Sequence, residues 1–191
     1  MNNLDNAIEN FKKGKIGIFP TDTAFGIGCR MDNETAVSRI YEIRKRPENK
    51  PLLVLVSSIK MAEKYVHIND KVRKKLIAKY WPGGLTLILP CNTMLVPRPI
   101  RSGGDNLAVR MPDNGDLLRI IEEVGVPIVA PSANFSGGKT PITLAEVDEK
   151  IIKMVDFVLS GVCTMKGVST IIDCTKGEWE IVRKGAVKIT L

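Results

Sequence analysis

The chain has 191 residues, of which 44% are hydrophobic and 5% aromatic, and its formal net charge is +7. This length and hydrophobic content suit one domain, residues 1–191, with a sizeable aliphatic core. The basic charge favours anionic partners such as nucleotides, phosphates or nucleic acid. No apolar run is long enough to span a bilayer and the N-terminus lacks signal-peptide features, so we expect a cytoplasmic protein without a membrane partner.

Hydrophobic periodicity predicts helices and strands in alternation. Helices are expected at residues 3–13, 33–45, 58–66, 70–80, 115–124 and 144–153, the last with a capping box of Thr143 and Glu146. Strands are expected at KIGIF, LLVLVS, LTLIL, NLAVRM, PIVA, DFVLS, STIID and EIVRK. The alternation favours an α/β domain with a mostly parallel or mixed sheet. Near the C-terminus, strands with no helix between them indicate some antiparallel pairing.

The cysteine and histidine patterns limit the kinds of metal and catalytic site that the chain can form. The cysteines form no CxxC pair and lie in or beside apolar segments; they are Cys29, Cys91, Cys163 and Cys174. This pattern predicts buried, reduced thiols and no structural zinc site. His67 is the one histidine and lies between predicted helices, so we expect it to be exposed or to cap a helix. A single histidine excludes a histidine-rich metal centre and disfavours a Ser–His–Asp triad.

Two polar segments follow predicted strands. FPTDTAFGIGC follows the first strand, and PSANFSGGKTPIT follows PIVA. In open α/β sheets, ligands bind at loops beyond the carboxyl ends of strands. The first segment is equally consistent with an ordinary turn that has a capping Asp or Thr, and it matches neither GxGxxG nor the P-loop. The small polar residues and glycines of the second favour an anion-binding loop over a plain surface loop.

Cations are concentrated in IYEIRKRPENKPLLVLV, residues 40–56, where four lie within residues 44–50. A solvated surface is the ordinary explanation of such a cluster. Arg110 and Arg183, by contrast, lie inside apolar predicted strands, where an arginine usually needs a partner. The strand arginines, Arg44, Arg46 and the polar glycine loop together indicate one anionic pocket.

A second hypothesis is an RNA-binding module. The stretch KVRKKLIAKY, residues 71–80, predicts an amphipathic helix with a basic outer face. Most such faces are merely solvated, and aromatic residues for base stacking are scarce. This hypothesis predicts RNA affinity with a steep salt dependence and no ATP turnover, and it leaves the polar loops unexplained.

Seven segments spanning residues 16–186 resemble, in this order, the YrdC-like threonylcarbamoyl-AMP synthase family: PTDTAFGIG, IRKRPENKPL, WPGGLTLIL, LAVRMP, PSANFSG, GVSTIID and IVRKGA. The resemblance implies a single twisted mixed β-sheet with helices on its faces and a basic concave active site. It implies a nucleotidyltransferase, L-threonylcarbamoyladenylate synthase, which makes threonylcarbamoyl-AMP and pyrophosphate from L-threonine, bicarbonate and ATP. The chain is expected to be the short, single-domain form.

The same resemblance implies partners. Mg²⁺ is expected to accompany ATP, held mostly by phosphates and water, with no metal site of the protein's own. Downstream proteins would transfer the threonylcarbamoyl group to adenosine 37 of tRNA. Separately from the resemblance, the basic helix makes tRNA or double-stranded RNA a candidate partner.

Site residues are carried over by motif. The catalytic and ATP-binding positions are the KxR pair and the SxN pair, which fall on Arg44, Arg46, Ser132 and Asn134. Arg183 should contact the phosphates. Arg110 should hold the threonine carboxylate, with Thr23 and Ser169 near the amino acid.

The chain departs from the family pattern at four places. Arg44 stands where the family usually has lysine, Phe25 replaces the tyrosine of PTDTxYG, and Lys45 replaces a frequent glycine. The histidine often found after RxP is absent, and Asn114 is nearest to its place. These departures keep a third hypothesis open, a paralogue of the same fold that uses another acyl or carbamoyl substrate.

Overall fold

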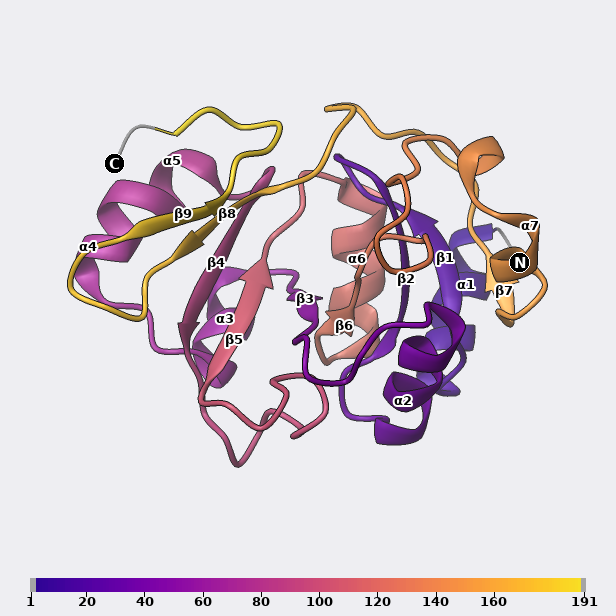
Figure 1. Cartoon of the computed structure of the whole chain (residues 1–191), viewed down its shortest axis with the longest axis horizontal. Helices are drawn as coiled ribbons and strands as arrows, with labels where there is room; N and C mark the ends of the chain where they lie inside the picture. The colour runs from indigo at the N-terminus through magenta and orange to yellow at the C-terminus, as the bar shows by residue number, and fades with distance from the viewer. Residues whose placement is uncertain (1–2, 190–191) are drawn as a thin grey trace.

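Nine strands form one mixed sheet in the computed structural model, which describes residues 3–189 (Figure 1). Their order across the sheet is β7-β1-β2-β6-β3-β5-β4-β8-β9. The bounds are β1 Gly17–Pro20, β2 Phe25–Arg30, β3 Leu53–Leu55, β4 Leu85–Pro90, β5 Asn106–Arg110, β6 Ile128–Val129, β7 Phe157–Val158, β8 Thr170–Asp173 and β9 Glu180–Arg183. The pairs β1/β7, β3/β5 and β4/β8 are parallel and the other neighbours are antiparallel. The predicted mixed sheet and the antiparallel pairing of the last two strands are confirmed.

The helices follow the predicted order. Their bounds are α1 Asn3–Lys12, α2 Glu34–Ile43, α3 Ile59–Tyr65, α4 Asp70–Val72, α5 Ala78–Tyr80, α6 Gly115–Val124 and α7 Glu149–Ile152, with a π-helical stretch Arg73–Ile77 (η1) and a 3₁₀ turn Leu144–Glu146 (η2). The predicted helix 70–80 is therefore continuous but has a π turn in its middle. Asparagine side chains cap α2 and α6, where Asn33 and Asn114 accept backbone N–H groups.

The predicted helix over residues 144–153 is wrong, because two local caps divide it. The capping box of Thr143 and Glu146 is present, but it holds only the 3₁₀ turn. Val147 then leaves the helical region, and Asp148 begins α7 by accepting the backbone N–H of Lys150. A second N-cap five residues after the first thus restarts the helix.

The interpretation of residues 19–29 as a loop is also wrong in its second half. Phe25–Arg30 forms β2, antiparallel to β1, so that only Thr21–Ala24 is a turn. Gly26 and Gly28 had suggested a loop because glycine is unfavourable in strands. At Gly28 a Cβ atom would lie 1.9 Å from the carbonyl oxygen of Val129. The glycine is therefore required by the close approach of the β6 backbone.

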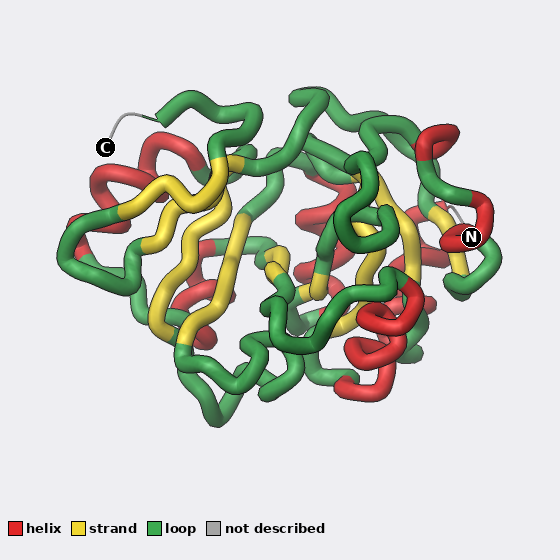
Figure 2. The backbone as a smooth tube through the Cα atoms, in the orientation of Figure 1, coloured by secondary structure: helices red, strands yellow, loops and turns green. Residues whose placement is uncertain are grey.

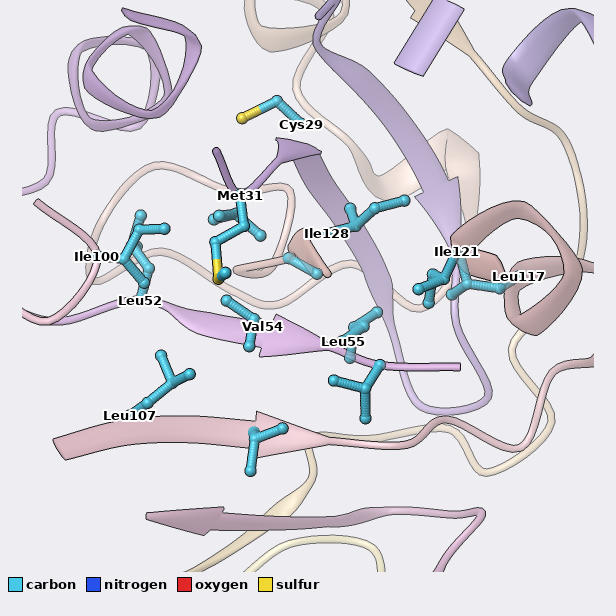
Figure 3. Packing of buried hydrophobic residues seen from close by; sticks show 14 of the residues in the cluster. Cys29, Met31, Leu52, Val54, Leu55, Ile100, Leu107, Leu117, Ile121 and Ile128 are labelled. Carbon is cyan, nitrogen blue, oxygen red and sulfur yellow. The ribbon is translucent and has the colours of Figure 1, made fainter. Parts of the chain in front are cut away.

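The core is mostly aliphatic, as predicted. β3 lies between β6 and β5, so that Val54 and Leu55 are enclosed by apolar side chains (Figure 3). The four cysteines are free and buried, as expected. Among residues 3–189, no helix is long and apolar enough to cross a membrane.

A long loop crosses the sheet from one end to the other. Residues 159–169 contain no helix or strand and connect β7, at one edge, to β8, near the opposite edge (Figure 2). The backbone N–H groups of Met165 and Gly167 donate to the carbonyls of Asp22 and Thr23, at 2.6 and 3.0 Å. The crossing loop is therefore attached to the turn between β1 and β2.

Replacing Gly28 with alanine should lower the free energy of unfolding by about 1–3 kcal/mol, the range for an overpacked core position. The added Cβ forces β2 and β6 apart. Urea unfolding measures the change. Gly177→Ala is the control, because no atom lies within 4 Å of an added Cβ there. Equal stability of the two variants would show that the β2–β6 contact relaxes freely.

Candidate active site

A cleft, partly open to solvent, lies beside the turn between β1 and β2. Its walls come from that turn and the start of β2, from β3 and the end of β5, from the segment after β6, and from both ends of the β8–β9 hairpin. Of the eight predicted site residues, five line it: Thr23, Arg110, Ser132, Ser169 and Arg183. Arg44, Arg46 and Asn134 lie outside this lining. The sequence prediction thus separates into two groups of residues.

Arg110 is the most enclosed cation of the cleft, with a relative exposure of 4%. Its Nε donates to the carbonyl of Gly83 at 2.9 Å and its Nη1 to Oγ1 of Thr23 at 2.7 Å. Its Nη2 donates to Oδ1 of Asp22 in a buried ion pair. Burial lowers the pKa of Arg110, and the Asp22 charge opposes that shift. The expectation that a strand arginine needs a partner is confirmed, and one partner belongs to the protein itself.

Sequence reasoning missed Asp22. The residue is 1% exposed, and the second oxygen of its carboxylate, Oδ2, is buried without a hydrogen-bond partner among the described residues. The available signal was the tripeptide Thr21-Asp22-Thr23 after a strand. In sequence this tripeptide is equally consistent with an ordinary turn that has a capping Asp or Thr, and nothing in it indicates a distant arginine.

The turn between β1 and β2 is organised by the hydroxyl of Thr21. Its Oγ1 accepts the backbone N–H groups of Thr23 and Ala24, both at 3.1 Å, and donates to the carbonyl of Ala24 at 2.8 Å. Such hydroxyl-to-backbone bonds stabilise tight turns. The turn consequently presents the Thr23 hydroxyl to Arg110.

Arg183 and Ser169 form a second polar wall. Nε of Arg183 donates to the Ser169 carbonyl and Nη2 to its hydroxyl, both at 3.0 Å. The Ser169 hydroxyl also lies 2.8 Å from that of Thr86. Burial lowers the pKa of Arg183, and the charge of Arg110 lowers it further. Two guanidinium groups therefore face one cleft, which suits an anionic ligand.

Arg44 belongs to the second group, with Asn134. Arg44 caps the C-terminus of α2, is 4% exposed, and its Nε donates to the Asn134 carbonyl at 3.1 Å. Its Nη1 and the Asn134 Oδ1 are buried and lack partners among the described residues. Burial, and then the charge of Arg46, lowers the pKa of Arg44 to about 10, so the group stays cationic at neutral pH. A buried cation with an unused donor indicates an anion-binding position.

The other cations of that stretch have different surroundings. Arg46 is half-buried, and its guanidinium holds its own turn by donating to the carbonyls of Lys50 and Pro51, at 3.2 and 2.9 Å. The ammonium of Lys45 lies 5.2 Å from the centre of the Phe135 ring. The loop of Ser132 and Asn134 connects the two groups, because Ser132 lines the cleft and Asn134 contacts Arg44.

The remaining departures are now located. Phe25 is fully buried in β2 at the cleft wall, where the family's tyrosine would bring a hydroxyl. Asn114 caps α6 by accepting the N–H of Leu117 at 3.0 Å, and it is not a cleft residue. His67 is exposed, as expected. In the described part of the chain, no group of three or more His, Cys, Asp or Glu residues is placed to hold a metal ion.

Comparison with known proteins shows which family the chain belongs to. The family model Sua5_yciO_yrdC, described as "Telomere recombination", matches residues 9–185. The chain is 37% identical over 179 residues to the threonylcarbamoyl-AMP synthase of Pyrococcus abyssi, covering 93% of this chain and 52% of that protein. It is 34% identical over 177 residues to the Bacillus subtilis synthase, and the match covers 92% of this chain and 51% of that protein. The chain thus spans about half the length of these two relatives.

A relative of similar length and several solved structures agree. The putative threonylcarbamoyl-AMP synthase of Methanocaldococcus jannaschii is 38% identical over 178 residues, which cover 92% of this chain and 82% of that protein. The crystal structure of P. abyssi Sua5 complexed with L-threonine matches with a TM-score of 0.89 at 35% identity, over 95% of this chain and 54% of that one. The crystal structure of Escherichia coli YciO is 24% identical, and the match covers 95% of this chain and 88% of that one. It shares the fold, with a TM-score of 0.85.

Replacing Arg44 with methionine should raise the free energy of unfolding by about 1–3 kcal/mol, because an apolar side chain of similar length removes a desolvated charge. Pyrophosphate should raise the melting temperature of the parent chain and not that of the variant, since only the parent keeps the anion position. Calorimetric melting measures both effects. Arg119→Met, at an exposed cation of α6, is the control. A destabilised Arg44 variant that pyrophosphate still protects would contradict the assignment.

Proposed function

We propose, because the chain belongs to the Sua5/YciO/YrdC family, that it makes threonylcarbamoyl-AMP and pyrophosphate from L-threonine, bicarbonate and ATP. It would thereby act as a nucleotidyltransferase. Relatives at 34–38% identity that cover most of this chain carry the synthase name. A related protein, P. abyssi Sua5, has been crystallised with L-threonine.

One observation carries the proposal: the chain holds two separate groups of cations, each with one buried arginine, and one polar loop joins them. Arg110 and Arg183 face the cleft, and Arg44 offers an unused donor beside Asn134. A reaction between a small carboxylate and a triphosphate needs two such positions side by side. A single-substrate anion site would need only one.

The proposed reaction has two steps. The amine of threonine and bicarbonate give a carbamate with loss of water, and a carbamate oxygen then attacks the α-phosphorus of ATP, from which pyrophosphate leaves. The enzyme must bring anionic reactants together and stabilise the charge on the leaving group. No covalent nucleophile is needed. Burial raises the pKa of Cys163, the cysteine beside Asp22 and Arg110, so its thiol stays protonated and suits no nucleophilic role.

The residues of the two sets would divide this work. Arg110 would bind the threonine carboxylate, with Thr23 and Ser169 beside the amino acid. The triphosphate would be bound by guanidinium, hydroxyl and amide donors from Arg44, Arg46, Ser132, Asn134 and Arg183. Guanidinium groups suit this task because their planar donors match phosphate oxygens.

Mg²⁺ is proposed as an ion that arrives with ATP, bound by the phosphates and water. The chain's own residues supply positive charge and hydrogen bonds, and none of the steps above is assigned to a metal held by the protein. The only buried carboxylate in contact with a cleft arginine, among the described residues, is Asp22, which already pairs with Arg110.

The proposal includes a cytoplasmic location and downstream proteins that transfer the threonylcarbamoyl group to adenosine 37 of tRNA. RNA contact stays a prediction. On the predicted basic helix, Lys71 lies 4.6 Å from the Trp179 ring centre and Arg73 pairs with Glu63. Lys74, Lys75 and Lys79 are exposed and remain the positions at which this helix would meet an RNA backbone.

Pyrophosphate release from ATP should require both L-threonine and bicarbonate. The reason is that the attacking group exists only after the two have combined. A coupled pyrophosphate assay, with mass spectrometry of the nucleotide product, measures this dependence. Equal release without threonine would contradict the synthase and favour a paralogue with another substrate.

Arg44→Ala should lower turnover by about 10²–10³, the effect of losing one preorganised donor to developing charge. Arg44→Lys should keep most activity because it preserves the cation that the family usually has at this position. Steady-state pyrophosphate release measures both, with melting curves as a check of folding. Parent-like turnover of Arg44→Ala would mean that this cation takes no part. Activity that appears only in Arg44→Lys would identify a diverged, non-synthase chain.

A further inference from the structure

Asp22 is a buried carboxylate beside the cleft that the proposed reaction does not use. Its side chain has an exposure of 0%, and it is not part of the cleft lining. One oxygen accepts an N–H of Arg110, and the other has no hydrogen-bond partner among the described residues. A buried charge with an unsatisfied oxygen opposes folding unless its partner repays the desolvation. The presence of this carboxylate therefore indicates that Asp22 has a function, which it exerts through its contact with Arg110.

The Arg110 guanidinium is held by three acceptors. Two come from the β1–β2 turn, Oδ1 of Asp22 and Oγ1 of Thr23, and the third is the carbonyl of Gly83, just before β4. A guanidinium has five N–H donors, so three such bonds leave two. Two parallel N–H donors are what a carboxylate takes in a bidentate contact. Asp22 is the charged acceptor of the three and gives the strongest of the three restraints.

Charge balance supports the same task. Arg183 shares the cleft, and the positive charge of Arg110 lowers its pKa. Two cations this close repel each other. A carboxylate behind Arg110 offsets the repulsion without occupying the cleft, so both guanidinium groups can stay in place before a ligand arrives.

We propose that Asp22 is a positioning residue, which holds Arg110 so that its two remaining N–H groups meet the carboxylate of the amino-acid substrate. The inference rests on the proposed function, which assigns the carboxylate of L-threonine to Arg110. Asp22 touches no substrate and acts through Arg110 alone.

Calorimetric titration of the full chain with L-threonine tests this role in Asp22→Ala and Asp22→Asn. Asp22→Ala should raise the Kd for L-threonine by up to about 100-fold, because a misplaced binding group can lose that much. Asp22→Asn keeps an oxygen acceptor toward Arg110 and loses the charge, so we expect a smaller rise of about tenfold. The Kd for a non-hydrolysable ATP analogue should stay within about twofold in both, because the nucleotide is assigned mainly to other residues.

The affinity for L-threoninamide distinguishes a positioning role from a merely structural one, because structural damage would weaken the binding of both ligands. L-Threoninamide lacks the carboxylate, so its affinity should be equal in the parent and in both Asp22 variants. Asp32→Asn is the matched control: Asp32 forms an ion pair with Arg30, with Oδ1 and Nε 2.5 Å apart, at the exposed end of β2. This control should bind both ligands like the parent.

Parent-like L-threonine affinity in both Asp22 variants would overturn the inference, and so would an equal loss of threonine, threoninamide and nucleotide binding. If Asp22→Ala does not fold, Asp22→Asn decides alone by the same criteria. A parent chain that does not bind L-threonine overturns the proposed function as well. A parent that binds it, with variants that bind it equally, overturns only the role of Asp22.

Discussion

The buried ion pair of Asp22 and Arg110 is the interaction on which the cleft depends. It joins the β1–β2 turn to the end of β5, although β2 and β5 are separated in the sheet by β6 and β3. Because both charges are desolvated, their attraction offsets the free-energy cost of burial only when the two groups are in direct contact. This requirement holds the turn over the end of the strand. The crossing loop is in turn hydrogen-bonded to the carbonyls of Asp22 and Thr23, and it continues into Val168 and Ser169 of the cleft wall. The ion pair thus connects the turn, which also holds the crossing loop, to the end of β5.

Most strands and helices could be predicted from the sequence because their apolar patterns are strong, and the failures have local causes. β2 was missed because its glycines, which the neighbouring backbone requires, lower strand propensity. The helix after Thr143 was overextended because Asp148 acts as a second cap. In the site, the arginines of β5 and β9 could be predicted from their apolar surroundings. Asp22 could not, because its partner is 88 residues away in sequence and a carboxylate between two threonines is typical of an ordinary turn.

The basic stretch after α2 shows what a charge pattern leaves open. Three consecutive cations look alike in sequence, yet each has a different environment. Arg44 is buried with an unused donor, Lys45 lies over Phe135, and Arg46 binds the carbonyls of its own turn. A sequence count of charges cannot separate these cases, because burial depends on the distant loop of Asn134 that closes over Arg44. The family resemblance singles out Arg44, and the structure shows that burial with an unused donor distinguishes it from its two neighbours.

The order of strands has a consequence for how the molecule forms during synthesis. β1 pairs with β7 and β4 with β8, so neighbours in the sheet join the early and late parts of the chain, and Ile16 bonds to Asp156 across 140 residues. Contacts of such long range are slow to form, because a large loop must close first. Arg183 lies in β9, so the cleft is completed only when the chain has emerged from the ribosome as far as residue 183. A nascent chain that lacks β8 and β9 would leave Arg110 and Asp22 without Ser169 and Arg183, and its cleft would be incomplete.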